Sequence, residues 1–211
     1  MLNTHERFAD QYRILIPLLR WPIWQNIHPH AITLAGCLVG IAIWPLLMMH
    51  WTGWAIIALL LTGLLDTLDG AVARYLRLTS PQGAALDIFC DRIVEFSILM
   101  GLYAVDPATR AIPVLFMLGC ILLCITSFLV VGIFSVNEAS KGSFYSPGLI
   151  ERAEAFGFFF LMIFWPTLFK PLAWIFSLLV FLTALIRLWQ FFRNSRLVPV
   201  RVERRDDETV N

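Results

Sequence analysis

The chain has 211 residues, of which 59% are hydrophobic and only 15% are charged. Soluble domains carry about 25% charged residues, so this composition excludes a soluble globular domain and predicts an all-α integral membrane protein. The formal net charge of +1 gives no indication of a nucleic-acid partner.

The first expected element is a surface helix over residues 5–20, where charged and large apolar side chains alternate. Such a mixture is typical of an amphipathic helix lying in the membrane interface. Trp21 and Trp24 follow it, and tryptophan is enriched at that level of the membrane. Residues 1–30 are therefore expected to form an interfacial helix and linker. No apolar core follows closely behind a basic start, so no cleaved signal peptide is predicted.

Six apolar segments come next, each near the ~20 residues that a membrane-spanning helix requires. They cover residues 31–50, 54–74, 84–105, 111–134, 153–169 and 171–192. Only Lys170 and Pro171 separate the last two segments, which predicts a tight hairpin there. The expected fold is a single all-α membrane domain over residues 1–192, with six transmembrane helices. A charged cytoplasmic tail, 193–211, follows it.

The placement of Lys and Arg predicts the orientation of these spans, because cytoplasmic loops carry an excess of both. With the N-terminus in the cytoplasm, twelve basic residues fall on the cytoplasmic side: Arg7, Arg13, Arg20, Arg74, Arg77, Lys141, Arg152, Arg193, Arg196, Arg201, Arg204 and Arg205. Only Arg110 and Lys170 fall outside, and Arg92 and Arg187 lie within spans. We expect a protein of the bacterial inner membrane.

Four aspartates lie within 26 residues, at the facing cytoplasmic ends of the second and third expected spans. Asp66 and Asp69 are three residues apart and Asp87 and Asp91 are four apart, so each pair shares one helix face. The short turn at 78–82 would let the two helices pack antiparallel and bring the pairs together. Clustered carboxylates repel one another unless a cation neutralises them. An all-oxygen ligand set suits Mg²⁺ or Mn²⁺.

The whole stretch reads D-x2-D-G-x2-A-R-x8-G-x3-D-x3-D. At every fixed position it resembles the signature of the CDP-alcohol phosphotransferase family. The resemblance implies an Mg²⁺-dependent enzyme of phospholipid biosynthesis. It would move a phosphatidyl group from a CDP-linked lipid, such as CDP-diacylglycerol, to the hydroxyl of a small alcohol and release CMP. The family is commonly homodimeric, so a homodimer is a further expectation.

The resemblance also implies roles for individual residues. Asp91, in the last motif position, would be the catalytic base that takes the proton of the acceptor hydroxyl. The metal ligands would be Asp66, Asp69, Asp87 and Asp91. The positions that would contact the CDP donor are Gly70, Ala73, Arg74, Gly83 and Thr33.

One departure from the family pattern precedes the first span. The family commonly has Pro-Asn-x-x-Thr there, whereas this chain has Pro29-His30-x-x-Thr33. Pro29 suits the first turn of a helix. His30 either alters a donor contact or serves as an interfacial capping residue.

Other charged residues near the motif have two interpretations each. Glu95, one turn after Asp91, is either a hydrogen-bond partner within the site or the ion-pair partner of Arg92, since intramembrane charges usually pair. Lys141 and Arg152 are candidates to hold a phosphate on the acceptor, because Arg binds phosphate bidentately. They are otherwise ordinary positive-inside anchors.

Two other functions use acidic clusters in membranes. An intramembrane prenyltransferase also binds a diphosphate through aspartates and Mg²⁺, but it needs a longer chain with widely separated clusters. A cation channel or carrier with an acidic ring would account for the charges but not for the Gly-x-x-Ala-Arg spacing.

Overall fold

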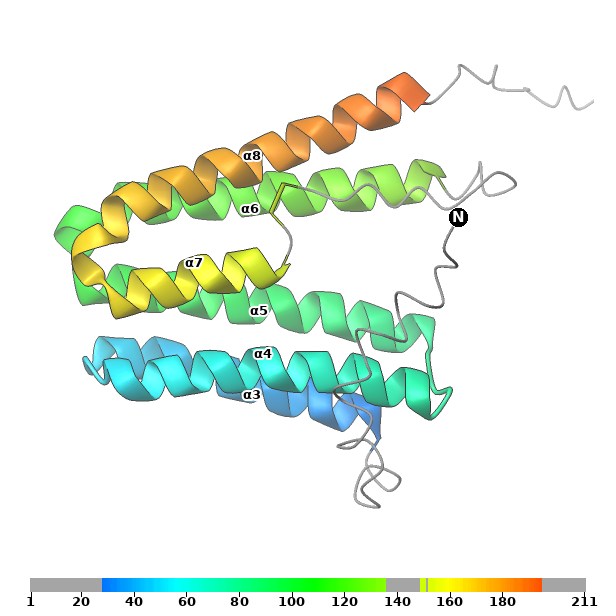
Figure 1. Cartoon of the computed structure of the whole chain (residues 1–211), viewed down its shortest axis with the longest axis horizontal. Helices are drawn as coiled ribbons and strands as arrows, with labels where there is room; N and C mark the ends of the chain where they lie inside the picture. Colours follow the sequence, from blue (N-terminus) through cyan, green and yellow to red (C-terminus); the bar gives the residue numbers. More distant parts are fainter. Residues whose placement is uncertain (1–27, 136–148, 151, 195–211) are drawn as a thin grey trace, which may run out of the picture.

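A computed structural model describes residues 28–135, 149–150 and 152–194. These residues form six α-helices and one short 3-10 helix, η3, with no strand among them (Figure 1). The elements are α3 (Pro29–Met48), α4 (Thr52–Tyr75), α5 (Pro81–Val105), α6 (Pro107–Ser135), α7 (Arg152–Phe164), η3 (Pro166–Leu168) and α8 (Phe169–Asn194). The expected surface helix at 5–20 and most of the charged tail lie outside the described residues.

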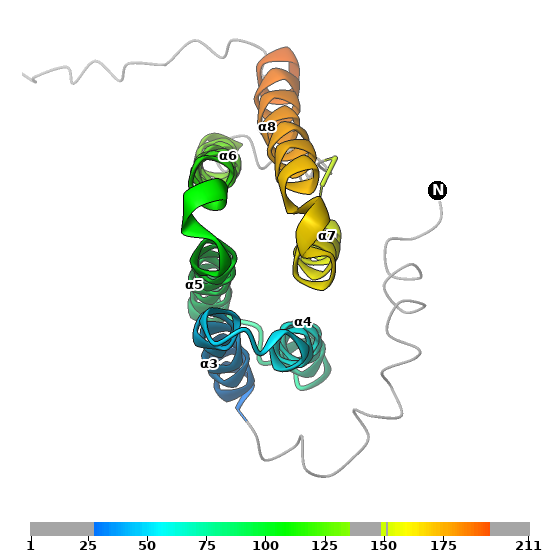
Figure 2. The same cartoon turned by 90° about the vertical axis from the view of Figure 1, so that its left-hand side faces the viewer.

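The helices are arranged as two rows of three. Seen end-on in Figure 2, α3, α5 and α6 form one row, and α4, α7 and α8 form the other. Each helix runs antiparallel to the one before it (Figure 1). The C-terminus of α4 and the N-termini of α3 and α5 therefore lie at the same end of the bundle, and the shorter α7 begins partway along the bundle from that end. The acidic motif belongs to this end.

Glycines let α3 and α5 approach closely. A Cβ on Gly40 of α3 would lie 2.5 Å from Cγ2 of Val94, and one on Gly101 of α5 would lie 2.8 Å from Cδ1 of Leu47. Ile43 and Ile98 are completely buried between the helices of this core. The contact of α3 with α5 holds the start of α3 against the aspartates of α5.

The turn between α4 and α5 is fixed at both ends. Arg77 takes a left-handed backbone conformation with φ of 56°, and the N–H of Leu78 reaches the Ala73 carbonyl at 2.8 Å. These are features of a Schellman motif, which ends a helix cleanly. Ser80 then caps α5 by accepting the Gly83 N–H at 3.1 Å, and Pro81 occupies the first helical position.

Four elements among the described residues are long and apolar enough to cross a membrane: α3, α4, α6, and η3 together with α8. At 25 residues, α5 is of similar length, but it contains Asp87, Asp91, Arg92 and Glu95. α7 has 13 residues, which corresponds to roughly 20 Å and is shorter than the ~30 Å hydrocarbon core.

The break between the last two helices differs from the sequence-based prediction, which placed it at Lys170 and Pro171. α7 ends at Phe164, and the turn is made by Trp165 and η3. Pro166 explains the difference, because proline has no N–H and disfavours helical backbone in the residue before it. Trp165 accordingly has φ of −116° and ψ of 81°. Pro171 lies in the first turn of α8, where a missing N–H costs little.

Candidate active site

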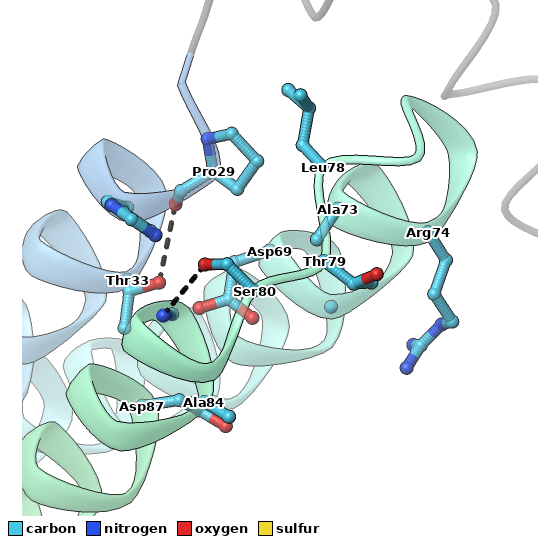
Figure 3. A pocket seen from close by; sticks show the side chains of 13 residues that line it. Pro29, Thr33, Asp69, Ala73, Arg74, Leu78, Thr79, Ser80, Ala84 and Asp87 are labelled. Atoms are coloured by element: carbon cyan, nitrogen blue, oxygen red, sulfur yellow. Dashed lines mark hydrogen bonds between the residues drawn. The ribbon is translucent and has the colours of Figure 1, made fainter.

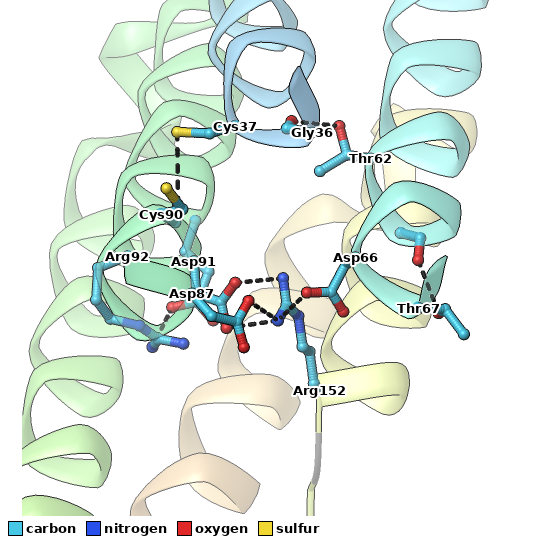
Figure 4. Close-up of polar contacts among 12 residues, drawn as sticks. Gly36, Cys37, Thr62, Asp66, Thr67, Asp87, Cys90, Asp91, Arg92 and Arg152 are labelled. Atoms are coloured by element: carbon cyan, nitrogen blue, oxygen red, sulfur yellow. Dashed lines mark hydrogen bonds and ion pairs between the residues drawn. The ribbon is translucent and has the colours of Figure 1, made fainter. Parts of the chain in front are cut away.

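The antiparallel α4–α5 pair brings the motif aspartates together. Carboxylate oxygens of Asp66, Asp69 and Asp87 all lie within 4.8 Å of one another. Asp69 is buried and the other two are half-buried. Asp91 lies one turn further along α5, on the same side (Figure 4). The helix spacing predicted from the sequence thus produces a compact acidic cluster, which we define as Asp66, Asp69, Asp87 and Asp91.

The acidic cluster has the chemistry of a divalent-cation site. Asp69 Oδ2 and Asp87 Oδ1 are buried and accept no hydrogen bond from any described residue. Burying a carboxylate oxygen without a partner is costly. A hard cation would satisfy both atoms, and an all-carboxylate set suits Mg²⁺ or Mn²⁺.

Arg152, the first residue of α7, inserts its guanidinium into the other half of the acidic cluster. Its Nη1 lies 2.6 Å from Asp66 Oδ1 and 2.5 Å from Asp91 Oδ2, and its Nη2 also pairs with Asp91. The distance from Nη1 to Asp87 Oδ1 is 3.9 Å, too long for a hydrogen bond. One guanidinium therefore bridges α4 and α5 (Figure 4).

A cavity of about 190 Å³ adjoins Asp69 and Asp87 of the acidic cluster, and Arg152 does not line it (Figure 3). It is formed by the N-terminal turns of α3 and α5 and the last turns of α4. All five residues that the family resemblance assigned to the CDP donor line it, namely Thr33, Gly70, Ala73, Arg74 and Gly83. Asp69 and Asp87 line it too, so the donor positions and the acidic cluster share one surface.

Small residues keep the cavity of about 190 Å³ open. A Cβ on Gly83 would lie 3.0 Å from Nε2 of His30, and one on Gly70 would lie 3.1 Å from Nη2 of Arg74. His30 itself lines the cavity, directly opposite the capped start of α5. The residue that departs from the family pattern is therefore part of the candidate donor site.

A second cavity, of about 680 Å³, lies between α4 and α7. Its walls are mainly apolar and include Leu60, Leu64, Phe156 and Phe160. Asp66 and Arg152 also line it. The acidic cluster thus adjoins two cavities, a smaller one lined by several polar side chains and a larger, mainly apolar one.

Of the remaining predicted residues, Glu95 has a definite partner. Arg92 Nη1 donates to Glu95 Oε2 at 2.5 Å, which matches the ion-pair interpretation. Lys141, the second candidate for an acceptor phosphate, lies outside the described residues. No sequence signal indicated that Arg152 would contact the aspartates, because the contact joins residues 61 positions apart.

Comparisons with known proteins show the family of the chain. The family model for CDP-alcohol phosphatidyltransferase matches residues 26–197. Inner membrane protein YnjF of Escherichia coli is 32% identical over 194 residues, covering 89% of this chain and 92% of the relative. Phosphatidylinositol phosphate synthase of Corynebacterium glutamicum is 32% identical over 164 residues, covering 73% of this chain and 70% of the relative.

Solved structures of Mycobacterium tuberculosis phosphatidylinositol phosphate synthase (PgsA1) share the fold. The form with CDP-DAG bound aligns with a TM-score of 0.63 at 24% identity, covering 85% of this chain and 94% of that one. The complex with manganese and citrate aligns with a TM-score of 0.62 at 24% identity, covering 83% and 88%. From the family model and the relatives at 32% identity, we conclude that this integral membrane protein belongs to the CDP-alcohol phosphatidyltransferase family of phospholipid-synthesising phosphotransferases.

Proposed function

We propose that the protein transfers a phosphatidyl group from CDP-diacylglycerol to the hydroxyl of a small, phosphorylated alcohol and releases CMP. The observation that carries the proposal is the shared surface of the acidic cluster and the cavity of about 190 Å³. Buried oxygens of Asp69 and Asp87 that accept no hydrogen bond from the described residues adjoin the same space as the five donor positions, so a diphosphate and a cation would meet there.

The four aspartates have two proposed roles. Asp66, Asp69 and Asp87 hold Mg²⁺ or Mn²⁺, and Asp91, one turn further along α5, is the proposed fourth ligand. A bound divalent cation would neutralise the donor diphosphate and stabilise the departing CMP. Asp91 is the proposed base for the acceptor hydroxyl. It is paired with Arg152, so it becomes available as a base once Arg152 has another anion to bind.

The two cavities suit the two parts of a CDP-linked lipid. The N-terminus of α5 borders the smaller cavity, and helix N-termini favour phosphate groups. The larger cavity has apolar walls along α4 and α7 and accommodates part of an acyl chain. The M. tuberculosis relative of the same fold was solved with CDP-DAG bound, which supports this donor.

Arg152 favours an acceptor that carries a phosphate. Its guanidinium already lies among the carboxylates that would perform the chemistry, and Arg binds phosphate bidentately. The C. glutamicum relative is a phosphatidylinositol phosphate synthase, which supports the same class of acceptor. Lys141 is proposed as a second phosphate ligand.

The proposed topology has six spans and a cytoplasmic active site. α5 and α7 complete the count, with Asp87, Asp91 and Glu95 of α5 and Arg152 of α7 half-buried in the bundle, as charged groups at membrane depth usually are. Arg110 and Lys170 belong to the end of the bundle opposite the aspartates, as the positive-inside rule requires. CDP-linked substrates made in the cytoplasm would then reach the site directly.

The test is CMP release by the purified protein in detergent with CDP-diacylglycerol and Mg²⁺, with alcohols added one at a time. Glycerol 3-phosphate and inositol phosphate are compared with glycerol, inositol, serine and choline. Release that depends on one phosphorylated alcohol, and that EDTA abolishes, is the expected result. Release with an unphosphorylated alcohol only would refute the proposed acceptor class. No release and no Mg²⁺-dependent CDP binding would refute the function.

A further inference from the structure

Thr183 on α8 has an unusual set of hydrogen bonds. Its Oγ1 accepts the backbone N–H groups of Leu149 and Ile150, each at 3.2 Å. The same hydroxyl donates to the Leu179 carbonyl at 2.9 Å. A threonine hydroxyl has one proton to donate and two lone pairs, so all of its capacity is used. Thr183 is only 1% exposed, so water does not replace these bonds.

The two anchored amides lie just before α7. Leu149 and Ile150 closely precede the start of that helix, whose first residue is Arg152. Arg152 in turn pairs with Asp66 of α4 and Asp91 of α5. The Thr183 hydroxyl therefore fixes the backbone two residues away from the guanidinium that bridges the acidic cluster.

We propose that Thr183 is a positioning residue for Arg152. By binding the chain at Leu149 and Ile150, it sets where α7 begins and keeps the guanidinium among the carboxylates of Asp66 and Asp91. This inference rests on the proposed function in one respect, because those carboxylates are assigned there to a divalent cation.

A measurable consequence follows from the charges. In the absence of substrates, Arg152 and a divalent cation compete for Asp66 and Asp91. A cationic side chain in contact with a carboxylate lowers the affinity of that carboxylate for protons by about tenfold or more. It lowers the affinity for a metal cation for the same electrostatic reason, so removing it should raise that affinity on the order of tenfold. Arg152→Gln should therefore strengthen Mn²⁺ binding by about tenfold. Thr183→Val, which loosens Arg152 without removing it, should strengthen binding by less.

The experiment is a titration with Mn²⁺ followed by EPR of the free ion, on the purified full-length protein in detergent without substrates. Thr183→Val keeps the shape of the side chain but cannot accept the two N–H groups. Thr183→Ser keeps the hydroxyl and should match the wild type. Ser177→Ala is the matched control, because Ser177 is buried on the same helix and its hydroxyl donates to Ala173 within α8.

The double variant Thr183→Val/Arg152→Gln separates positioning from general destabilisation. If Thr183 acts through Arg152, the valine has no further effect once Arg152 is gone, and the double variant binds Mn²⁺ as Arg152→Gln does. Two results would overturn the proposal. In the first, Thr183→Val changes the Mn²⁺ affinity equally in the wild-type and Arg152→Gln backgrounds. In the second, Thr183→Val alone binds Mn²⁺ with wild-type affinity although Arg152→Gln does not.

Failure of the proposed function would look different. If neither the wild type nor Arg152→Gln binds Mn²⁺, the metal site proposed above is wrong. The wild type, the two single variants and the double variant are then compared by thermal unfolding in EDTA, where Arg152 still pairs with Asp66 and Asp91. A non-additive change in midpoint supports Thr183 as the positioning residue, and additive changes overturn it.

Discussion

Replacing Gly40 by alanine tests how the α3–α5 contact supports the site. The new Cβ would lie 2.5 Å from Cγ2 and 2.9 Å from Cγ1 of Val94, whereas carbon atoms prefer about 3.5–4.0 Å. Val94 is 2% exposed and β-branched, so it has little rotamer freedom with which to move away. The helices must therefore separate by roughly 1 Å.

The expected loss of stability combines two terms. Overpacking of this kind costs about 1–3 kcal/mol, and exchanging glycine for alanine in a helix returns up to ~1 kcal/mol. Both methyl groups of Val94 would lie closer than 3.0 Å to the new Cβ, so we expect the overpacking cost in the upper part of its range, about 2–3 kcal/mol. After the return of ~1 kcal/mol, Gly40→Ala should destabilise the protein by about 1–2 kcal/mol. CMP release should also fall, because Thr33 on α3 and Asp87 on α5 line the same cavity.

The assay is thermal unfolding in detergent, with Gly119→Ala as the matched control. Gly119 is also within a helix, and apart from its chain neighbours and the backbone of its own helix no described atom lies within 4 Å of the place where its Cβ would be. This variant should therefore be neutral or slightly stabilised. Adding Val94→Ala to Gly40→Ala should recover part of the loss, because it removes both clashing methyl groups. A Gly40→Ala protein as stable as the wild type would refute the steric argument, and so would strictly additive losses in the double variant.

Three further changes test other parts of the structure. Asp69→Asn should weaken divalent-ion dependence and donor binding together, because it removes a charge from the acidic cluster; an unchanged Mn²⁺ titration would remove Asp69 from the ligand set. Gly83→Ala should raise the KM for the CDP-linked donor, because the new Cβ would lie 3.0 Å from His30 Nε2. Adding His30→Ala to this variant should lower the KM again, and an unchanged KM in the double variant would show that a clash with His30 is not the cause. His50→Gly should raise the free energy of unfolding by about 1 kcal/mol, because His50 follows α3 with φ of 58° and glycine adopts that conformation without strain. Thermal unfolding measures the change, and an unchanged or lowered midpoint would show that no strain is relieved at this position.

The local parts of the site were predictable from the sequence. The three- and four-residue spacing of the aspartates placed each pair on one helix face, and the short turn at 78–82 predicted that the two helices pack antiparallel. Because both signals are set within a few residues, the α4–α5 hairpin and its acidic cluster followed directly. The Arg92–Glu95 pair is one turn long and was one of two alternatives that the sequence left open.

The long-range parts were not predictable in the same way. Arg152 reaches Asp91 across 61 residues, and Thr183 reaches Leu149 across 34, so no helical period connects these residues. The predicted end of α7 was wrong, because hydropathy continues unbroken through Trp165 and only the backbone restriction of Pro166 stops the helix. Contacts between distant segments determine the first two features, and one proline determines the third.

The most direct test of the proposed chemistry compares CMP release by Asp91→Asn with release by Asp106→Asn. Asp106 lies between α5 and α6, where Thr109 donates to its carboxylate from within the next helix, far along α5 from the acidic cluster. We predict that Asp91→Asn loses turnover while it still folds and binds the CDP donor in the presence of Mg²⁺, and that Asp106→Asn releases CMP at the wild-type rate. Near-normal release by Asp91→Asn would contradict the assignment of Asp91 as the base.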